Sequence, residues 1–463
     1  MYSNNGFSLK VIAAACLLSA LAGEPAFGQV LQGAAAFGTW RDDKPGVRRL
    51  IRPQDLPPVS KASDGPQQVV PMPAGARPQV PAGFSAELVT SELRNTRAIR
   101  AAPNGDLFVA SSMSNTVHVM RIPAGSAKPE RITVFATGLT QPFGIAFYPL
   151  GPNPRWVYIA NSDGLVRFPY KNGDLQATGK PERIVEGILP RHHWTRDIVF
   201  SADGNTLYFS VGSGSNVALD MFPAPQVAWY PQPHIINDLA EWVKTKPLGS
   251  AWDTEELRAN VLSFDPNGKN MKIVATGLRN CASMALQPIT GQLWCVVNER
   301  DELGDNTPFD YSTHVVEGAF YGWPWYYIGG NEDPRQAGMR PDLKNNVTIG
   351  DVLFQAHSAP LGIAFYQGDN FPAEYRGSAF VTMRGSWNRP NRTGYKVVRL
   401  LFDASGKPTG EYEDFMTGFV VSDSQIWGTP VGIAVAKDGS LFVTEDSNGT
   451  IWRVSYQGTA RSR

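Results

Sequence analysis

Apolar and polar residues alternate in short runs along most of the chain, and one such pattern recurs six times. Each copy has a short apolar strand, a turn rich in Gly, Pro, Asn or Asp, and a second apolar strand. Alternation with a period of two around an Asp-Gly or Asn-Gly turn is the strongest short-range signal for a β-hairpin. The six predicted hairpins lie at residues 99–109, 143–159, 196–209, 282–294, 361–382 and 431–443.

Successive hairpins are separated by about 45 to 85 residues, which suits four-stranded blades that carry insertions of unequal length. Six such units predict an all-β chain folded as a six-bladed β-propeller, in which residues 450–455 supply the strand that joins the last blade to the first. A pair of β-sandwiches is the alternative fold, but sandwiches do not repeat one hairpin pattern in this way. Loops on one face of a propeller surround a central cavity, where we expect a ligand to bind.

The ends of the chain differ from this pattern. Residues 1–28 have the features of a secretory signal peptide, with Lys10 before an apolar run over residues 11–22 and a small-x-small site at Ala26-Phe27-Gly28. We therefore expect export to the periplasm or secretion from a bacterial cell. Residues 29–82 are rich in proline and predict an extended arm, residues 83–456 form the propeller, and residues 457–463 form a tail.

The longest interruption of the repeats is the insertion at residues 217–260. Apolar residues recur at helical spacing over residues 235–243, which predicts a short helix. Two interpretations of this insertion fit the sequence. It either covers the cavity face as a cap or forms an inert excursion on the surface.

Charge and composition exclude several partners. The 463 residues contain 42 Lys and Arg against 42 Asp and Glu, so no electrostatic argument favours nucleic acid or an anionic membrane. After the signal peptide the sequence contains no run of eighteen apolar residues, so no membrane span is predicted.

Export would leave Cys281 and Cys295 in an oxidising compartment, where a disulfide can form. A simple register about the turn at 289–292 does not place the two cysteines opposite each other, so the sequence leaves open whether they are bonded. The sequence contains no Cys-x-x-Cys-His motif for the attachment of a c-type haem. Electrons from any redox reaction must therefore leave through another protein.

Three groups of residues could carry chemistry at the cavity. His192 and His193 precede the third hairpin, where an imidazole can act as a general base, although a pair of exposed loop histidines also fits. Arg279-Asn280 precedes the fourth hairpin and suits either a carboxylate-bearing ligand or a salt bridge between blades. The loop at residues 298–306 is rich in carboxylates and typical of either a calcium site or a solvated acidic turn.

Two further segments are distinctive. Residues 321–328 are densely aromatic, which favours packing between blades, although Trp and Tyr at a cavity rim also bind sugars. Arg384, Arg389 and Arg392 cluster around a tryptophan in an insertion between two strands. These cations either hold carboxylates or lie in solvent.

Taken together, these segments resemble one family. The resemblance rests on His193-Trp-Thr-Arg-Asp-Ile-Val-Phe200, Gly277-Leu-Arg-Asn280, Asn298-Glu-Arg-Asp301 with Leu303-Gly-Asp305, Phe320-Tyr-Gly-Trp-Pro324, and His357-Ser-Ala-Pro-Leu-Gly362 with Gly385-Ser-Trp-Asn-Arg389. The chain is similar to the glucose/sorbosone dehydrogenases, and within them to the L-sorbosone dehydrogenase branch, from about Gly83 to Ser455.

The resemblance implies a propeller that binds pyrroloquinoline quinone (PQQ) and calcium. It implies that His193 is the general base, that Arg279 stabilises the developing oxyanion, and that Arg279 and Asn280 contact the quinone. Arg384 or Arg389 would hold a carboxylate of PQQ, and the backbone carbonyls of Asp301 and Glu302 would bind Ca2+. The implied reaction transfers hydride from the C1 aldehyde or hemiacetal of a sugar or ketoaldehyde to PQQ, gives an acid or lactone, and passes electrons to an external acceptor such as a soluble cytochrome or a quinone.

The chain departs from its relatives at two places. Ser111-Ser112 stands where relatives often have Glu, and Thr429 stands where they tend to have Arg, so both positions are expected to offer fewer cofactor contacts. Two other functions fit the propeller. One is a calcium-dependent lactonase, which needs more carboxylates around the cavity, and the other is a binding module without catalysis, which has no need of this set of residues.

Overall fold

The computed structural model describes residue 1 and residues 29–63, 65–188, 190–221, 226–228 and 234–458. Residues 2–28 of the predicted signal peptide and residues 459–463 of the predicted tail lie outside the described residues. No helix in the described part of the chain is long and apolar enough to cross a membrane.

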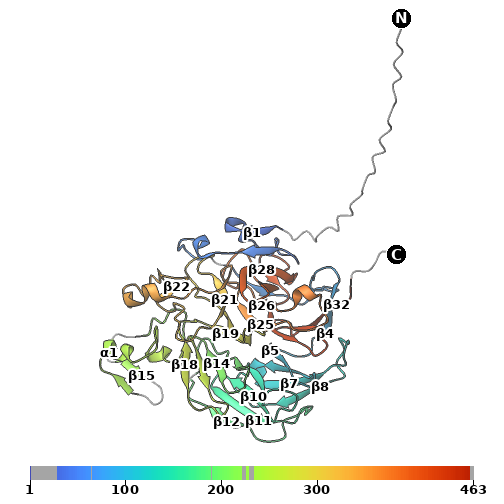
Figure 1. Cartoon of the computed structure of the whole chain (residues 1–463), viewed down its shortest axis with the longest axis horizontal. Helices are drawn as coiled ribbons and strands as arrows, with labels where there is room; N and C mark the ends of the chain where they lie inside the picture. Colours follow the sequence, from blue (N-terminus) through green and yellow to red (C-terminus); the bar gives the residue numbers. More distant parts are fainter. Residues whose placement is uncertain (2–28, 64, 189, 222–225, 229–233, 459–463) are drawn as a thin grey trace.

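Six sheets, each with an antiparallel core of four strands, surround a common centre (Figure 1). This confirms the predicted six-bladed β-propeller, and the first two strands of every blade are the predicted hairpins. Blades one to three consist of β5 (Thr96–Ala101), β6 (Leu107–Ser111), β7 (Thr116–Arg121) and β8 (Arg131–Ala136); β9 (Ile145–Tyr148), β10 (Trp156–Asn161), β11 (Gly164–Pro169) and β12 (Glu182–Val185); and β13 (Ile198–Phe200), β14 (Leu207–Val211), β17 (Asn260–Phe264) and β18 (Lys272–Ala275).

Blades four to six follow the same order. They consist of β19 (Cys281–Leu286), β20 (Leu293–Val297), β21 (Asp310–His314) and β24 (Val352–Phe354); β25 (Pro360–Phe365), β26 (Ala379–Met383), β27 (Lys396–Phe402) and β28 (Pro408–Met416); and β30 (Pro430–Val435), β31 (Leu441–Glu445), β32 (Ile451–Tyr456) and β4 (Phe84–Thr90). The first strand of each blade contacts the first strand of the next, so β5, β9, β13, β19, β25 and β30 line the centre of the ring.

Residues from both ends of the propeller close the ring. The predicted joining segment, residues 450–455, lies in β32, which is the third strand of the last blade. Its outer partner is β4, which pairs with it from Phe84 opposite Tyr456 to Thr90 opposite Ile451. The last blade therefore combines three C-terminal strands with one strand that precedes the first blade.

The apolar core lies between neighbouring blades. Strand alternation directs one set of side chains of each blade toward the next, where they are removed from water. Between blades two and three, for example, Tyr158, Leu207 and Phe209 are fully buried in one cluster. These layers hold the blades in register and position the loops at their ends.

The predicted arm packs along the outside of the fifth and sixth blades (Figure 1). Its strand β2 (Arg48–Leu50) adds to the edge of β28, and β1 (Val30–Gln32) pairs with β2. Further along, β3 (Gln68–Val69) pairs with β29 (Gln425–Ile426). The arm also contains the 3₁₀ turns η1 (Gly33–Ala36) and η2 (Pro53–Asp55).

A buried group of four charges attaches the arm to blade five. The Arg49 guanidinium donates to Asp414 at 2.8 Å and to Asp43 at 2.9 Å, and the Lys396 ammonium lies 2.6 Å from Asp43 and 2.7 Å from Asp414. Two cations and two anions balance one another, and the Arg49 side chain is only 1% exposed. The arm is thus tied to the propeller by charges that have little access to water.

The insertion at residues 217–260 differs in part from its prediction. Its helix α1 (Leu239–Lys244) begins after Asp238, whose carboxylate accepts a hydrogen bond from the amide of Glu241 at 3.0 Å. The residues just before it, which the apolar spacing placed in the helix, belong instead to β16 (His234–Ile236), which pairs with β15 (Gln226–Ala228). The cap at Asp238 sets the start of the helix, and a helix that begins there cannot include Ile235 and Ile236.

The remaining elements are short. They are the pair β22 (Tyr326–Tyr327) and β23 (Asn331–Glu332), and the 3₁₀ turns η3 (Ser112–Ser114), η4 (Asp253–Glu255), η5 (Pro341–Asn346) and η6 (Ala373–Tyr375). The predicted aromatic segment at 321–328 packs against the insertion, with the rings of Trp252 and Trp325 5.7 Å apart and both buried. Packing, as the sequence favoured, is the role that the structure gives these aromatics.

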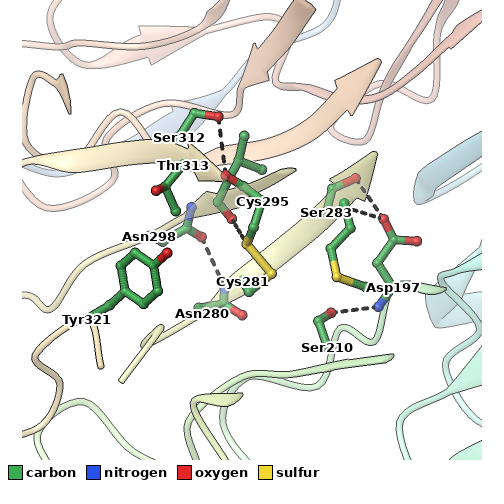
Figure 2. Close-up of a disulfide and its surroundings, with 12 residues drawn as sticks. Asp197, Ser210, Asn280, Cys281, Ser283, Cys295, Asn298, Ser312, Thr313 and Tyr321 are labelled. Carbon is green, nitrogen blue, oxygen red and sulfur yellow. Dashed lines mark hydrogen bonds between the residues drawn. A yellow bond between two sulfur atoms is a disulfide. The ribbon is translucent and has the colours of Figure 1, made fainter. Parts of the chain in front are cut away.

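The two cysteines of blade four form a disulfide (Figure 2). In the hairpin of β19 and β20, Met284 faces Cys295, and an unbroken register would place Cys281 opposite Asn298, with its side chain on the other face of the sheet from Cys295. A β-bulge between Cys281 and Ser283 instead places Cys281 opposite Val297. The bulge reverses the facing of Cys281, so that both sulfurs lie on one side of the sheet with the Cα atoms 5.8 Å apart.

The attachment of the arm predicts a large cost for losing its buried cation. Arg49→Met leaves Asp43 and Asp414 with one cation, and removing one partner of a buried ion pair typically costs about 3–5 kcal/mol. We expect a lower midpoint of chemical unfolding. Arg41→Met is the matched control, because Arg41 belongs to the same arm but forms its ion pair with Asp423 in solvent. Equal effects of the two substitutions would contradict this assignment.

The disulfide predicts a measurable loss of stability when it is removed. Its cysteines are 14 residues apart, and a closed loop of this size restricts the unfolded chain by about 3 kcal/mol. The double variant Cys281→Ala/Cys295→Ala is therefore expected to unfold at a lower denaturant concentration. Wild-type protein unfolded in the presence of reductant should match the variant, and a variant that equals the oxidised wild type would show that the bridge adds no stability.

Candidate active site

The blade topology gathers the predicted site residues on one face of the propeller. Because the first two strands of a blade are antiparallel, the first strand begins where the second ends. His193 precedes the first strand β13, and Arg279 and Asn280 directly precede the first strand β19. Asp301 follows the second strand β20, and the segment from Arg384 follows the second strand β26. All of them therefore lie at the same face.

A cavity of about 250 Å³ opens at this face. Three of the predicted residues, His193, Arg279 and Asp301, share its wall. The full lining is His192, His193, Arg279, Asn298, Glu299, Asp301, Asp310, His357, Ala359, Trp387 and Asn388. No described residue of the insertion at 217–260 belongs to this lining, so the described part of the insertion does not cap the cavity.

A larger hollow of about 520 Å³ lies elsewhere on the molecule. It is formed by the turns between the first and second strands of blades one and six, around Asp106 and Asp438, and these turns lie at the opposite face. Its two aspartates are already paired, Asp106 with Arg121 at 2.7 Å and Asp438 with Arg453 at 3.1 Å. The smaller cavity, rather than this hollow, contains the chemistry.

The hydrogen bonds of His193 determine its tautomer. Its Nδ1 lies 2.8 Å from the hydroxyl oxygen and 3.2 Å from the carbonyl oxygen of Ser213. The hydroxyl of Ser213 donates its own hydrogen to the carbonyl of Ser215 at 2.7 Å, so both oxygens of Ser213 act as acceptors toward the imidazole. Nδ1 must therefore carry the proton, and Nε2 keeps its lone pair.

Burial and nearby charge keep this imidazole neutral. Burial, followed by the positive charge of Arg279 and the neighbouring His192, lowers the pKa of His193 well below its ordinary value of 6.5. Gly212 allows the close packing of this region, since a Cβ atom there would lie 2.6 Å from Cβ of His193 and 2.5 Å from Oδ1 of Asn280. His193 is thus a neutral base with a fixed orientation.

Arg279 is held rigidly by carbonyl oxygens. Its Nη1 donates to the carbonyl of Glu299 at 2.8 Å, and its Nε and Nη2 donate to the carbonyl and side-chain oxygens of Asn216 at 3.2 and 2.9 Å. The carboxylate of Asp301 is 3.8 Å away. Burial lowers the pKa of Arg279, but a guanidinium keeps its proton in proteins, so a fixed positive charge lies in the cavity wall.

Asn280 lies behind the wall. Its Nδ2 donates to the side chain of Asn298 at 3.1 Å (Figure 2), whereas its Oδ1 is buried with no donor in the described part of the chain. The disulfide begins at the next residue, Cys281, and fixes this end of β19 to β20. Asn280 is therefore not among the residues that line the cavity, and its contact with the quinone stays a prediction.

Three acidic residues, Glu299, Asp301 and Asp310, also belong to the lining. Burial raises the pKa of Glu299 to about 8 and that of Asp310 to about 6. Although burial works in the other direction, a hydrogen bond from His357 and the charge of Arg279 lower the pKa of Asp301. The same interaction with Asp301 raises the pKa of His357. Asp301 and His357 form an ion pair at 3.3 Å.

The backbone carbonyl of Asp301, one of the two predicted calcium ligands, is occupied by hydrogen bonds in this conformation. The carbonyl of Asp301 accepts hydrogen bonds from Nε of Arg300 at 2.9 Å and from Asn216 at 3.3 Å. The other predicted ligand is the backbone carbonyl of Glu302; the carboxylate of this residue pairs with Arg335 at 2.6 Å, and this contact does not involve that carbonyl. A guanidinium at the proposed ligand oxygen repels a cation, and the described residues contain no group of three or more His, Cys, Asp or Glu arranged for a metal. Calcium stays a prediction that this geometry does not support.

The arginines of the 384–392 segment do not line the cavity. Arg384 donates to Asp446 at 3.2 Å, and Asp446 also pairs with Arg97. Arg389 is buried against the carbonyl of Ala356 at 3.4 Å, and Arg392 donates to carbonyls that include Gly65 of the arm at 2.7 Å. Arg384 and Arg392 are thus held by protein groups, whereas Nε of Arg389 is buried with no acceptor among the described residues. A carboxylate of PQQ at Arg384 or Arg389 would require this segment to rearrange, because neither residue lines the cavity.

The two positions where the chain departs from its relatives are also away from the cavity lining. The hydroxyl of Ser111 lies 3.2 Å from Nδ1 of His118. Thr429 is buried and hydrogen-bonds to Glu445 and Asp446. Both side chains have partners within the protein.

Four functional positions were not predicted as site residues. Trp387 and Asn388 lie between the arginines of the 384–392 segment and line the cavity themselves, Asp310 begins β21, and Ser213 follows the second strand β14. The rule that second strands end at the cavity face was enough to find Ser213. Trp387 and Asn388 depend on the path of an irregular loop, which the sequence pattern does not specify.

The cavity lining fits PQQ better than it fits a metal. PQQ is a planar ring system with quinone and carboxylate oxygens, which require donors and positive charge. Arg279 supplies a fixed positive charge, and the exposed indole of Trp387 offers an apolar surface for a ring. Glu299, with its raised pKa, is largely protonated at neutral pH and does not repel such an anion.

Comparisons with known proteins agree with this fold. A model of the Glucose / Sorbosone dehydrogenase family matches residues 93–386, and a TrAA12-like model matches residues 341–457. The chain is 27% identical over 392 residues to an uncharacterized protein of Borreliella burgdorferi, with 82% of this chain and 91% of the relative covered. It is 22% identical over 418 residues to the PQQ-dependent pyranose dehydrogenase of Coprinopsis cinerea, with 80% of this chain and 53% of the relative covered. The chain thus spans about half the length of that curated relative.

Solved structures share the fold. A Trichoderma reesei enzyme of family AA12 superposes with a TM-score of 0.65 at 19% identity, covering 84% of this chain and 99% of that one. The holo form of the PQQ domain of Coprinopsis cinerea pyranose dehydrogenase has a TM-score of 0.62 at 20% identity, and the match covers 84% of this chain and 98% of that one. The PQQ-bound aldose sugar dehydrogenase of Streptomyces coelicolor has a TM-score of 0.53 at 17% identity, and the match covers 81% of this chain and 99% of that one. Because the first family model covers more than half of the chain, the protein belongs to the glucose/sorbosone dehydrogenase family.

Proposed function

We propose that the protein is a PQQ-dependent dehydrogenase that oxidises the hydrated C1 aldehyde of a sugar or ketoaldehyde to an acid, or its cyclic hemiacetal to a lactone. Membership of the glucose/sorbosone dehydrogenase family supports the class of reaction. The matched pyranose dehydrogenase and aldose sugar dehydrogenase are described as PQQ-dependent and PQQ-bound, which supports the cofactor. Cavity chemistry supports the roles of individual residues.

The observation that carries the proposal is the neutral His193 with a free Nε2 at the cavity. Ser213 fixes its tautomer through Nδ1, and Arg279 lies in the same wall. Oxidation of a C1 hydroxyl needs a base for the hydroxyl proton and positive charge for the oxygen that becomes negative. His193 and Arg279 supply these two functions.

Each residue has one role in this reaction. Nε2 of His193 accepts the proton of the C1 hydroxyl while Ser213 holds the ring in place. The fixed charge of Arg279 stabilises the oxygen as its bond to C1 gains double-bond character. Bound PQQ supplies the acceptor for the hydride of C1. The electrons then leave for an external acceptor such as a soluble cytochrome or a quinone.

The substrate and the compartment follow from the same proposal. Any aldose or ketoaldehyde presents the same C1 group to His193, so L-sorbosone is one member of the proposed substrate class. An exported bacterial protein in the periplasm or outside the cell agrees with the predicted signal peptide. Such a compartment is also oxidising, and the disulfide of Cys281 and Cys295 is stable there.

Reconstitution tests the proposed activity. Protein stripped with chelator and supplied with PQQ is expected to reduce a dye in the presence of an aldose or L-sorbosone. His193→Ala should lower kcat by at least about 100-fold, because a general base contributes about 10²–10⁴. Ser213→Ala should retain PQQ but lower kcat by a smaller factor, since the tautomer is no longer fixed.

The controls separate the base from the fold and from metal. His314→Gln changes a histidine that pairs with Asp351 away from the cavity, so its activity should equal that of the wild type. Assays with added calcium and with excess chelator show whether the metal is needed independently of PQQ. Full activity of His193→Ala, or no PQQ retained by the wild type under either condition, would refute the proposal.

The low pKa of His193 predicts the pH dependence of the reaction. Its neutral form is the active base, and burial together with Arg279 lowers its pKa well below 6.5. The neutral form therefore persists as the pH falls through 6.5, and kcat/KM should decline only at lower pH. A profile of kcat/KM for the PQQ-loaded enzyme between pH 4.5 and 8 measures this limb. An acidic limb centred at or above pH 6.5 would show that another group limits the reaction.

A further inference from the structure

The N-terminal arm contacts a loop of the cavity face after its strand β2 has paired with blade five. The amide of Ser60 donates to the carbonyl of Leu303 at 2.9 Å. The amide and the hydroxyl of Ser63 donate to the two carboxylate oxygens of Asp305, each at 2.8 Å. Three hydrogen bonds therefore join this part of the arm to the loop that follows β20.

The same part of the arm contacts the segment that follows β26. Nη2 of Arg392 donates to the carbonyl of Gly65 at 2.7 Å and also to that of Pro66. Gly65 is buried, and a Cβ atom at this position would lie 2.1 Å from the carbonyl carbon of Arg389, so a side chain does not fit here. Residues 60–63, 65 and 66, called the strap below, thus bridge two separate loops.

Both loops carry residues of the cavity wall. Asp301 belongs to the loop after β20, and Trp387 and Asn388 belong to the segment after β26. Nδ2 of Asn388 donates to the carboxylate of Asp301 at 2.7 Å, which joins the two loops at the cavity. No residue of the strap is among the lining residues, so the strap can act on the cavity only through these loops.

The two loops have little regular structure of their own. Residues 298–309 and 384–395 are all described, and neither stretch contains a strand or a helix. Without a ladder of hydrogen bonds to neighbouring strands, the position of a loop depends on its other contacts. The family models match residues 93–386 and 341–457, and the strap precedes both. Support for this part of the wall therefore comes from outside the matched part of the chain.

We propose that the strap positions the two loops that form this part of the cavity wall. Its members are positioning residues, because they hold the loops and do not touch the cavity. The consequence for the cofactor rests on the proposed function, in which this cavity binds PQQ. When only a fraction of the molecules has an ordered wall, the apparent affinity for a ligand of that wall falls by the same fraction.

Hydrogen exchange of the protein without PQQ tests the positioning role. Peptides that contain Asp301 and Ser386 report on the two loops, because their amides are bonded to Asn216 at 3.0 Å and to Thr393 at 3.0 Å. In Ser63→Ala, the exchange of Asp301 should rise about 5-fold, as expected for the loss of one hydrogen bond that holds the loop. Ser63→Thr keeps the hydroxyl and should exchange as the wild type does.

Gly65→Ala is the stronger variant, since its Cβ atom forces the strap away from the segment after β26. The exchange of Ser386 should rise by at least about 10-fold, because two hydrogen bonds from Arg392 are lost. Thr39→Ala is the matched control and should not alter either loop. Thr39 belongs to the same arm, but its hydroxyl bonds to Asp42 within the arm at 3.2 Å.

Two results would overturn the positioning role. One is unchanged exchange of both loops in Ser63→Ala and Gly65→Ala. The other is an equal increase in the strands β19 and β25, since that would show a general loss of stability rather than a local release of the wall.

Titration of the same variants with PQQ tests the consequence for the cofactor. The Kd of Gly65→Ala for PQQ should rise by at least about 3-fold, because binding must first order the wall. Once the variant is saturated with PQQ, kcat should stay within about 2-fold of the wild type, since His193 and Arg279 are unchanged. A Kd equal to that of the wild type would overturn the link between strap and cofactor. If the wild type binds no PQQ but exchange rises in both variants, the proposed function fails and the positioning role stands.

Discussion

The antiparallel pairing of the first two strands in each blade is the constraint on which the site depends. It returns the end of the second strand to the face where the first strand begins, and the ring repeats this six times around one centre. Residues as far apart in sequence as His193 and Trp387 thereby reach one cavity. Closure of the ring by β4 and β32 keeps this arrangement fixed, because it leaves no open end at which a blade could turn away.

Within this frame, blade four needs an irregularity to build its part of the site. A regular hairpin would direct Cys281 away from Cys295, and the bulge after Cys281 reverses that facing. The resulting disulfide ties the end of β19 to β20 next to Asn280, while Arg279 spans to the carbonyl of Glu299 beyond β20. Two crosslinks, one covalent and one made of hydrogen bonds, hold the two segments that form this wall of the cavity.

The sequence predicted features that depend on local patterns. Every predicted hairpin became the first pair of strands in a blade, because alternation and turn chemistry act over about ten residues. The facing of the cysteines could not be predicted, since the bulge at residue 282 has no sequence signal of its own. Packing of the arm against β28 and β29 depends on contacts across more than 350 positions, such as Arg49 with Asp414.

In the candidate site, too, the residues placed by local sequence pattern were predicted and those placed by tertiary contacts were not. His193 and Arg279 reached the cavity because they lie in the segments just before the first strands β13 and β19, a position that the repeats define. Arg384 and Arg389 were expected there from their charge, but the loop after β26 turns them toward Asp446 and Ala356 and presents Trp387 and Asn388 instead. The path of a loop depends on its tertiary contacts, so charge in a sequence segment identifies a region but not the side chain that faces a ligand.

The buried arginines show how their surroundings decide what such a charge does. Arg49 pairs with two carboxylates and attaches the arm to the propeller. Its positive charge is neutralised by these partners and does not attract a ligand. Arg279 is fixed mainly by neutral carbonyl oxygens, with one carboxylate 3.8 Å away, so its positive potential extends into the cavity. Arg196 has carbonyls on one edge and no carboxylate on the other. A buried guanidinium that is held by dipoles rather than by anions keeps a positive potential that stabilises negative charge nearby, and both Arg279 and Arg196 have this arrangement close to His193.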